Sequence, residues 1–315
     1  MEWSTPAFWD SGATISVDLV LGMRYNYDSE RLNTYFGAAM SQSAALQFQF
    51  SFKAEPVLKW AGGKQIIARM LVEYFPKTYR RYFDPFVGGA SVALESRAMR
   101  GLLNDQNEWL IDAYRAIRDD WRQVARVLDT MKNTEAEFYR IRAIDPKTVD
   151  ESTRAAMLIY LNKTCFRGLF RVNKHNQFNV PYGRYDRRYY DPANLAAFSE
   201  FIGSFELRVG DFEVALAEAE PEDVVYLDPP YHRIGGYSDF NRYTSGKFKE
   251  IDHLRLRNVC VDLDRRGIRW VQSNSSTEYI RELYRDFHVS EITNRREINL
   301  DSKSRNITEY VIKNF

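Results

Sequence analysis

The sequence has few cysteines, almost no net charge and no long apolar run, and each shortage excludes a class of protein. Its two cysteines, Cys165 and Cys260, are too few for a disulfide framework or a four-cysteine zinc site, and they are typical of a reducing compartment. No stretch reaches the roughly 18 apolar residues of a membrane span, and Met1 to Asp10 lack a signal-peptide pattern. We therefore expect a cytoplasmic protein with no membrane partner.

The composition favours a folded chain. Hydrophobic residues make up 44% and charged residues 28%, which allows a sizeable core. The net charge of +1 gives no sign of nucleic-acid binding, so any basic surface must be local. Residues 1–51 differ from the rest, because they lack lysine and have no clear apolar period. We expect either a loosely attached, disordered extension or a start codon assigned too early, with Met40 as the alternative start.

Strands and helices alternate through 52–131 and 201–315. The expected strands are Arg81–Phe83, Gly101–Asn104, Phe205–Val209, Val224–Leu227, Ile268–Gln272 and Glu309–Ile312, and the expected helices include Gln65–Tyr74, Ser91–Met99 and Glu108–Met131. This alternation predicts a Rossmann-like, doubly wound α/β domain with a parallel sheet. Residues 132–200 break the alternation and predict an inserted, mainly helical lobe.

A glycine turn follows the first of these strands. The run from Asp84 to Ser91 contains Phe86 and Gly88, and glycine in a strand-to-helix turn lets the backbone approach a ligand closely. Asp105 ends the next strand, near the spacing of about 20 residues at which an acid binds ribose hydroxyls. Because the pyrophosphate pattern G-x-G-x-x-G is absent, S-adenosyl-L-methionine (AdoMet) fits better than NAD. A turn that merely needs glycine is the alternative.

A second glycine turn lies upstream, in the run from Lys59 to Lys64. It is not a P-loop, since the glycine spacing is wrong and no Ser or Thr follows Lys64. Trp60 could cover the methionine end of AdoMet, and Lys64 could hold a carboxylate. Taken alone, the run is better explained by an ordinary packed tryptophan and a solvated lysine.

The catalytic prediction rests on Asp228-Pro229-Pro230-Tyr231, which directly follows an apolar strand. Ligands of doubly wound sheets bind at that strand end, and the two prolines stiffen the loop. An exocyclic amine on a base is a poor nucleophile. Asp228 can accept one of its N–H groups, and a loop carbonyl can accept the other, which localises the lone pair and aligns it with a sulfonium methyl without a metal or a covalent intermediate. Tyr231 can stack on a base extracted from the duplex.

A basic segment follows residue 160. Between Leu161 and Tyr190 there are seven Lys or Arg residues and one acid, interleaved with Asn, aromatic residues and glycine. This mixture suits contacts with phosphates and base edges, although a solvated basic loop is the alternative. His232 is predicted to be a polar loop residue, and the two cysteines are predicted to be buried small hydrophobes.

These motifs, in this order, closely resemble the Dam-type DNA adenine-N6 methyltransferases (D12 class, α group) from about Pro56 to Phe315. The resemblance is carried by Lys59–Lys64, Asp84–Gly89, Asn104-Asp105, Arg171–Asn173, Phe178–Tyr185, Val209–Phe212, Asp228–Tyr231 and Ser273–Ser276. It implies an AdoMet-dependent methyltransferase sheet in 52–131 and 201–315, with 132–200 as the DNA target-recognition lobe.

The resemblance also implies site residues and partners. AdoMet contacts are implied for Trp60, Lys64, Asp84, Phe86, Gly88, Asp105, Asp211, Phe212 and Asp228, and DNA contacts for Arg171, Asn173, Asn179, Arg184 and Tyr185. The expected partner is double-stranded DNA, with GATC as the family's commonest target. A prokaryotic or phage enzyme is expected, acting as a monomer and in some settings beside a cognate restriction endonuclease.

Two departures and two alternatives stand beside this prediction. Arg167 occupies a position where the family often has Asn, which leaves the target sequence open, and residues 1–51 have no counterpart. An RNA or protein-amide methyltransferase would more often have Asn in place of Asp228 and would lack the lobe. A DNA-binding protein without catalysis would show damage to the catalytic loop, and this loop is intact.

Overall fold

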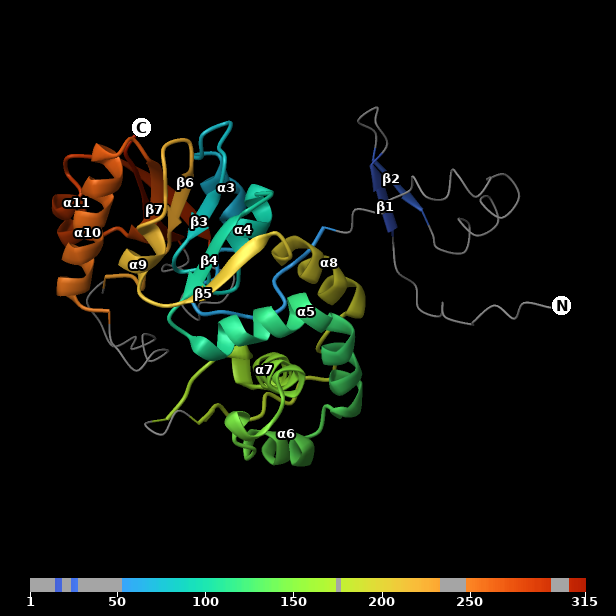
Figure 1. The fold of residues 1–315 in the computed structure, drawn as a ribbon. Coiled ribbons are helices and arrows are strands. Elements are labelled where there is room, and N and C mark those ends of the chain that lie inside the picture. Colours follow the sequence, from blue (N-terminus) through green and yellow to red (C-terminus); the bar gives the residue numbers. More distant parts are fainter. Residues whose placement is uncertain (1–14, 19–23, 28–52, 174–176, 233–247, 296–305) are drawn as a thin grey trace, which may run out of the picture. The chain divides into compact units, whose positions relative to one another are not determined.

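The computed structural model describes residues 15–18, 24–27, 53–173, 177–232, 248–295 and 306–315 (Figure 1). The chain divides into two units, Met1–Phe52 and Lys53–Phe315. Most of the predicted N-terminal extension lies outside the described residues, as do three residues of the predicted basic segment, Lys174, His175 and Asn176.

The first unit contains a β-hairpin that was not predicted. Strand β1 (Ile15–Asp18) pairs antiparallel with β2 (Arg24–Tyr27), so that Ile15 faces Tyr27 and Asp18 faces Arg24. No element was expected here because the segment has no clear apolar period. The account of 1–51 as an extension stays a prediction.

The second unit is built on a seven-stranded sheet with the order β5-β4-β3-β6-β7-β9-β8 (Figure 1). The strands are β3 (Tyr82–Asp84), β4 (Gly101–Asp105), β5 (Phe205–Val209), β6 (Val224–Leu227), β7 (Arg269–Ser275), β8 (His288–Arg295) and β9 (Asn306–Lys313). Strands β3 to β7 are parallel, whereas β9 runs antiparallel to β7 and β8. The strand order reverses between β3 and β6, which makes this pair the switch point of the sheet. The predicted doubly wound α/β sheet is confirmed.

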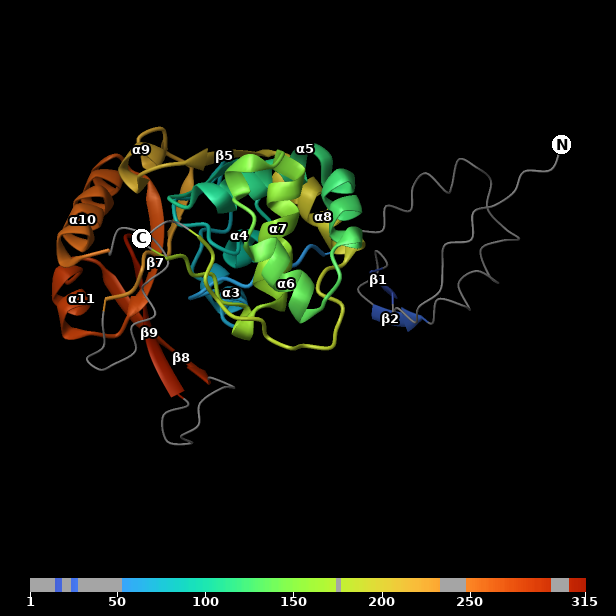
Figure 2. The same cartoon turned by 90° about the horizontal axis from the view of Figure 1, so that it is seen from below.

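Helices cover both faces of the sheet (Figures 1 and 2). One layer consists of α9 (Phe212–Leu216), α10 (Glu250–Arg265) and α11 (Glu278–Leu283), and the other face carries α3 (Ala68–Val72), α4 (Ser91–Ser96) and α5 (Glu108–Thr130). Along β6, Val224 and Tyr226 join the core on the α5 side, while Val225 and Leu227 join the core on the α10 side. Because successive side chains of a strand point to opposite faces, a strand buried on both faces must be apolar throughout.

The inserted segment forms a helical lobe around α7 (Glu151–Thr164). Every residue of α7 from Ala155 to Leu161 is buried, so this helix is enclosed on all sides. Helices α5 and α6 (Glu135–Arg142) lie beside it (Figures 1 and 2), and α8 (Pro192–Ile202) packs against α5. Since α5 packs in the same core as α7 and also as the sheet, the lobe and the sheet share one hydrophobic core. The boundary at residue 132 stays a prediction.

Some element ends differ from the expectation for local reasons. Helix α4 ends at Ser96, before the predicted Met99, because Arg97 adopts a left-handed φ of 54°. Helix α3 is shorter than Gln65–Tyr74. Strand β8 was not predicted, since its polar sequence HVSEITNR has no clear apolar run. Within the described part of the chain, no helix combines the length and apolar character that a membrane span requires.

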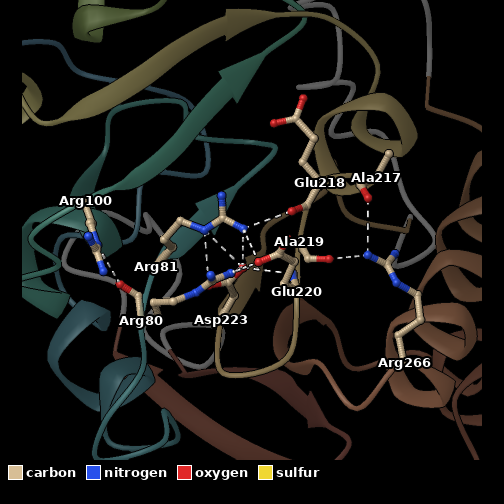
Figure 3. Close-up of polar contacts among 9 residues, drawn as sticks. All are labelled: Arg80, Arg81, Arg100, Ala217, Glu218, Ala219, Glu220, Asp223 and Arg266. Carbon is tan, nitrogen blue, oxygen red and sulfur yellow. Dashed lines mark hydrogen bonds and ion pairs between the residues drawn. The ribbon is translucent and has the colours of Figure 1, made fainter.

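The amino ends of β3 and β6 are tied together by an ion-pair cluster (Figure 3). Asp223 is fully buried and accepts hydrogen bonds from Arg81 Nη2 at 2.8 Å and from Arg80 Nε at 3.1 Å. Arg266, directly after α10, donates to the carbonyls of Ala217 and Ala219 nearby. These contacts hold the sheet at the edge opposite the end of β6 where the candidate site lies.

Candidate active site

Asp228 lies where β6 ends, at the carboxyl edge of the sheet beside the switch point. Its carboxylate forms an ion pair with Lys64, whose Nζ lies 2.7 Å from Oδ1 and 2.8 Å from Oδ2. It also accepts a hydrogen bond from Ser273 Oγ at 2.9 Å. The Asp228 side chain remains 18% exposed. Pro229 is buried and Pro230 is exposed. The predicted corner is therefore an anchored carboxylate with one side open to solvent.

Lys64 follows a tight turn. Gly63 N–H donates to the Trp60 carbonyl at 3.0 Å, Gly62 has a φ of 74°, and Lys64 Nζ donates to the Gly62 carbonyl at 2.7 Å. The Lys64 side chain is only 6% exposed. The sequence predicted that Lys64 holds a cofactor carboxylate, whereas the structure pairs it with Asp228. Because a buried ammonium needs a compensating charge, this pair fixes both side chains.

Tyr231 is anchored at both its ring and its hydroxyl. Its hydroxyl donates to Glu309 Oε2 of β9 at 2.7 Å, and Lys64 Nζ lies 4.5 Å from the ring centroid. Burial, reinforced by the nearby carboxylates of Asp228 and Glu309, raises the pKa of Tyr231 well above its ordinary value, so the phenol remains a donor. Glu309 was not predicted, because nothing in a terminal strand marks one acid as a partner of a distant loop. The stacking role of Tyr231 stays a prediction.

The glycine turn is built around Asp105. One carboxylate oxygen of Asp105 accepts the Gly88 N–H at 3.1 Å and the other accepts the Asn107 N–H at 2.9 Å. Burial raises the pKa of Asp105 to about 6, and these backbone hydrogen bonds act in the opposite direction. Gly88 has a φ of 47°, and a Cβ there would lie 2.7 Å from Trp60 Cδ1. Gly88 is thus needed both for its conformation and for the close approach of Trp60.

Asp84 is a buried residue at the start of the same turn. Its carboxyl accepts hydrogen bonds from the Tyr82 hydroxyl at 3.0 Å and from Phe86 N–H at 3.1 Å, and the residue is 2% exposed. Burial raises the pKa of Asp84 to about 8 despite these two bonds. Among the predicted cofactor residues, Asp84 therefore acts on the shape of the turn.

An aromatic group lines the next strand end. Phe86, Phe212 and Phe248 lie with ring centroids 5.5 to 6.1 Å apart. Asp211 caps α9 by accepting Glu213 N–H at 2.9 Å, and it is paired with Arg255 at 3.0 Å. Phe86 packs on Phe212, which directly follows Asp211 and is 1% exposed. The cofactor contacts of Phe86, Asp211 and Phe212 stay predictions.

Two of the predicted DNA residues bond to each other. Arg171 Nε donates to Asn179 Oδ1 at 2.7 Å, and its Nη2 donates to the Asn179 carbonyl at 3.2 Å. Asn173 Nδ2 donates to Gln177 Oε1 at 3.0 Å. Residues 165–173 and 177–185 form a strap that follows α7. Its two halves are joined by β-bridges between Val172 and Phe178 and between Cys165 and Tyr182.

The other two lie on the second half of the strap. Arg184 is 77% exposed, has a φ of 56° and lies 3.5 Å from Glu135. Tyr185 is half-buried, and its hydroxyl accepts the N–H of Arg167 at 2.9 Å. Arg184 therefore presents its charge to solvent, whereas Tyr185 shapes the turn that carries Arg167.

The remaining candidates are structural. His232 Nδ1 lies 3.1 Å from Thr277 Oγ1, and its ring stacks on Tyr279 at 4.4 Å, as expected of a packed loop residue. Both cysteines are free and buried, which confirms the prediction. Burial raises the pKa of Cys165 to about 12, so this thiol is inert as a nucleophile.

Residues 60–298 match the family model of the D12 class N6 adenine-specific DNA methyltransferases, which covers well over half of the chain. The chain belongs to this family. It is an adenine-specific DNA methyltransferase, and its seven-stranded sheet agrees with that class.

Its relatives carry matching names. The chain is 35% identical over 270 residues to the type II methyltransferase M1.LlaDCHI of Lactococcus lactis subsp. cremoris, covering 82% of this chain and 95% of the relative. It is 33% identical over 291 residues to the type II methyltransferase M.MjaIII of Methanocaldococcus jannaschii, covering 84% and 100%. It is 32% identical over 257 residues to the DNA adenine methylase of Escherichia coli K12, covering 80% and 92%. The function predicted from the sequence, methyl transfer to adenine N6 in DNA, is confirmed.

Proposed function

We propose that AdoMet is the methyl donor and that Asp228, Pro229, Pro230 and Tyr231 present adenine N6 to it. The observation that carries this proposal is the carboxylate of Asp228 at the switch point, held by Lys64 and Ser273 and open to solvent on one side. Ligands of doubly wound sheets bind at this position.

The chemistry needed is the alignment of a weak nucleophile. The lone pair of the adenine amino group is delocalised into the ring. Asp228 accepts one amino N–H and the Pro229 carbonyl accepts the other, which localises the lone pair on N6 and directs it at the donor. AdoMet would supply the methyl group from its sulfonium sulfur: the bond to N6 would form as the carbon–sulfur bond breaks, S-adenosylhomocysteine would leave, and the surplus N6 proton would be lost to solvent. Lys64 and Ser273 keep the acceptor in place before the base arrives, so that little reorganisation is left for the transfer.

The target base must leave the duplex to reach this corner. Enzymes that modify bases extrude them into a pocket and stack them on aromatic side chains. Tyr231, directly after Pro230, supplies the ring, and its hydrogen bond to Glu309 fixes the ring orientation. The extruded adenine is then held by its flat face and by its amino group together.

The residues around the glycine turn fit a nucleoside without phosphates. The space above Gly88 is filled by the Trp60 ring, and Asp105 beside it is only partly buried, so its carboxylate keeps lone pairs for ribose hydroxyls. Phe86 and Asp211 lie where the adenine of the cofactor would pack. Trp60 would cover its methionine end.

The lobe of residues 132–200 supplies the DNA contacts in this proposal. Arg184 offers an exposed charge to a phosphate. The base contacts are assigned in this proposal to Arg171, Asn173, Asn179 and Tyr185. GATC is the first target to test. Because two relatives are named type II methyltransferases, a place beside a cognate restriction endonuclease is the setting we propose, with a monomer as the working form.

The experiment is a methylation assay on unmethylated plasmid with purified protein and AdoMet, followed by long-read mapping of modified adenines. We expect N6-methyladenine in one short sequence context, and none without AdoMet. A protein that binds the plasmid but leaves no N6-methyladenine above background would contradict the proposal. Parallel reactions on RNA test the alternative substrate.

A further inference from the structure

The turn that carries Trp60 and the turn that carries Arg167 are joined through one buried side chain, Asn162 of α7. Asn162 Oδ1 accepts the Lys59 N–H at 2.8 Å, and its Nδ2 donates to the Lys59 carbonyl at 2.8 Å and to the Gly168 carbonyl at 3.1 Å. The residue is fully buried. One amide thus binds two chain segments that are more than a hundred residues apart in sequence.

The same two segments fit closely against each other. Gly168 has a φ of 67°, and a Cβ there would lie 2.4 Å from Lys59 Cδ and 3.0 Å from Lys59 Cβ. The rings of Trp60 and Phe170 stack with centroids 5.2 Å apart. Because the segments touch at Lys59 and Gly168 and at the two stacked rings, a displacement of one at these contacts must displace the other.

One end of this connection lies at the proposed cofactor site. The Trp60 ring covers Gly88, where an added Cβ would lie 2.7 Å from Trp60 Cδ1. The Gly88 N–H is held by the carboxylate of Asp105. A ligand that orders the glycine turn therefore also orders Trp60.

The other end lies at the surface of the lobe. Arg167 directly precedes Gly168, is exposed and has a φ of 60°, a conformation that is costly for a residue with a side chain. Its N–H donates to the Tyr185 hydroxyl at 2.9 Å. A cavity of about 260 Å³ is lined by residues of both turns, among them Trp60, Gly89, Arg167 and Gly168. The Arg167 turn is thus held in place from the cofactor side.

We propose that Asn162 is a positioning residue that couples occupancy of the cofactor site to DNA binding by the lobe. The inference rests on the proposed function, since it takes the Trp60 turn as part of the cofactor site and the Arg167 turn as part of the DNA surface. Coupling between two sites is reciprocal, so each ligand tightens the binding of the other by the same factor.

The test is the affinity for S-adenosylhomocysteine, measured by calorimetry with and without a duplex that contains the mapped target. We expect the duplex to tighten binding in the wild type by at least about fivefold. In Asn162→Ala this factor should fall to about one, although each ligand alone still binds. Thr164→Val, which removes a buried hydroxyl bonded to Tyr160 in the same helix, is the matched control and should keep the wild-type factor.

A wild type without coupling, or an Asn162→Ala variant that keeps the wild-type factor, would overturn the inference. If Asn162→Ala does not fold, Gly168→Ala tests the same contact, because its new Cβ pushes on Lys59 and strains the backbone; retained coupling there has the same meaning. A wild type that methylates DNA but shows no coupling refutes this inference alone, whereas a wild type that neither binds nor methylates DNA refutes the proposed function.

Discussion

Ser273 of β7 donates its hydroxyl hydrogen to Asp228 Oδ1 at 2.9 Å, across the boundary between two neighbouring strands. The Tyr226 hydroxyl lies 2.9 Å from the same Ser273 Oγ. Because Ser273 donates its one hydroxyl hydrogen to Asp228, it accepts the hydrogen bond from Tyr226. Ser273 is fully buried. The sheet therefore helps to orient the proposed catalytic carboxylate, together with Lys64.

Removing this hydroxyl tests that relationship. A hydrogen bond to a charged group contributes about 1.5–3 kcal/mol, so Ser273→Ala should lower kcat by about 10-fold or more, with little change in the KM for DNA. Ser273→Thr keeps the hydroxyl and should recover most of the rate. Single-turnover methylation measures both, and a wild-type kcat in Ser273→Ala would contradict the positioning role.

Arg184 should act through a phosphate. Its side chain is 77% exposed, and its contact of 3.5 Å with Glu135 is too exposed to compete with a phosphate for the guanidinium. Arg184→Ala should weaken binding to all sequences and reduce the slope of log Kd against log salt by about 0.9. Arg126→Ala on α5, where the side chain is 65% exposed, is a charge-matched control and should leave the slope unchanged. Equal slopes in Arg184→Ala and the wild type would exclude this contact.

The cluster in Figure 3 should govern stability at low pH. Burial alone would raise the pKa of Asp223, but the hydrogen bonds from Arg81 and Arg80 outweigh it and hold the pKa below its usual value. The carboxylate therefore stabilises the fold above the unfolded pKa of about 4, and this contribution is lost as the pH falls through the folded pKa. Asp223→Asn should lose about 2–3 kcal/mol at pH 7. Urea unfolding measures the difference in the free energy of unfolding between the wild type and Asp223→Asn. This difference should be smaller at pH 3 than at pH 7, and a difference independent of pH would be inconsistent with this account.

Asp84 should show the opposite sign. Its folded pKa of about 8 lies above the unfolded value, so the wild type loses stability as the pH rises towards 8. Asp84→Asn mimics the protonated carboxyl and can keep the contacts with Tyr82 and Phe86. We expect the free energy of unfolding of the variant to rise relative to that of the wild type by about 1.4 kcal/mol per pH unit between the unfolded pKa of about 4 and pH 8. Above pH 8 the difference should stay constant. Thermal melts between pH 5 and 9 measure this, and parallel curves would rule out a buried, protonated Asp84.

The sequence predicted the ends of β6 correctly, because this strand is buried on both faces and leaves an unbroken apolar run. It also predicted the ends of β5, an edge strand in which buried Phe205 and Leu207 alternate with exposed Glu206. Strand β8 was missed because it lies at the edge of the sheet beside β9 and is largely polar. The β1–β2 hairpin was missed for a related reason, since it lacks an apolar period.

The sequence indicated which residues to examine at the site, but it did not indicate the contacts between them. Asp228, Gly88 and Asp105 carry local signals, namely a strand end, a turn and a spacing. The pairing of Lys64 with Asp228, and of Tyr231 with Glu309, joins residues 164 and 78 positions apart. Such pairs depend on the order of the strands in the sheet. The sequence predicts a doubly wound sheet but does not predict which strands are neighbours.

The most direct test of the central claim is the methyl-transfer rate of Asp228→Ala on a duplex that contains the mapped target. The account predicts a fall of at least about 100-fold, while binding of the same duplex, measured by fluorescence anisotropy, stays within a few-fold of the wild type and a thermal melt shows a folded protein. Transfer at the wild-type rate by folded Asp228→Ala would contradict the account, because adenine N6 would then be activated without the carboxylate at the end of β6.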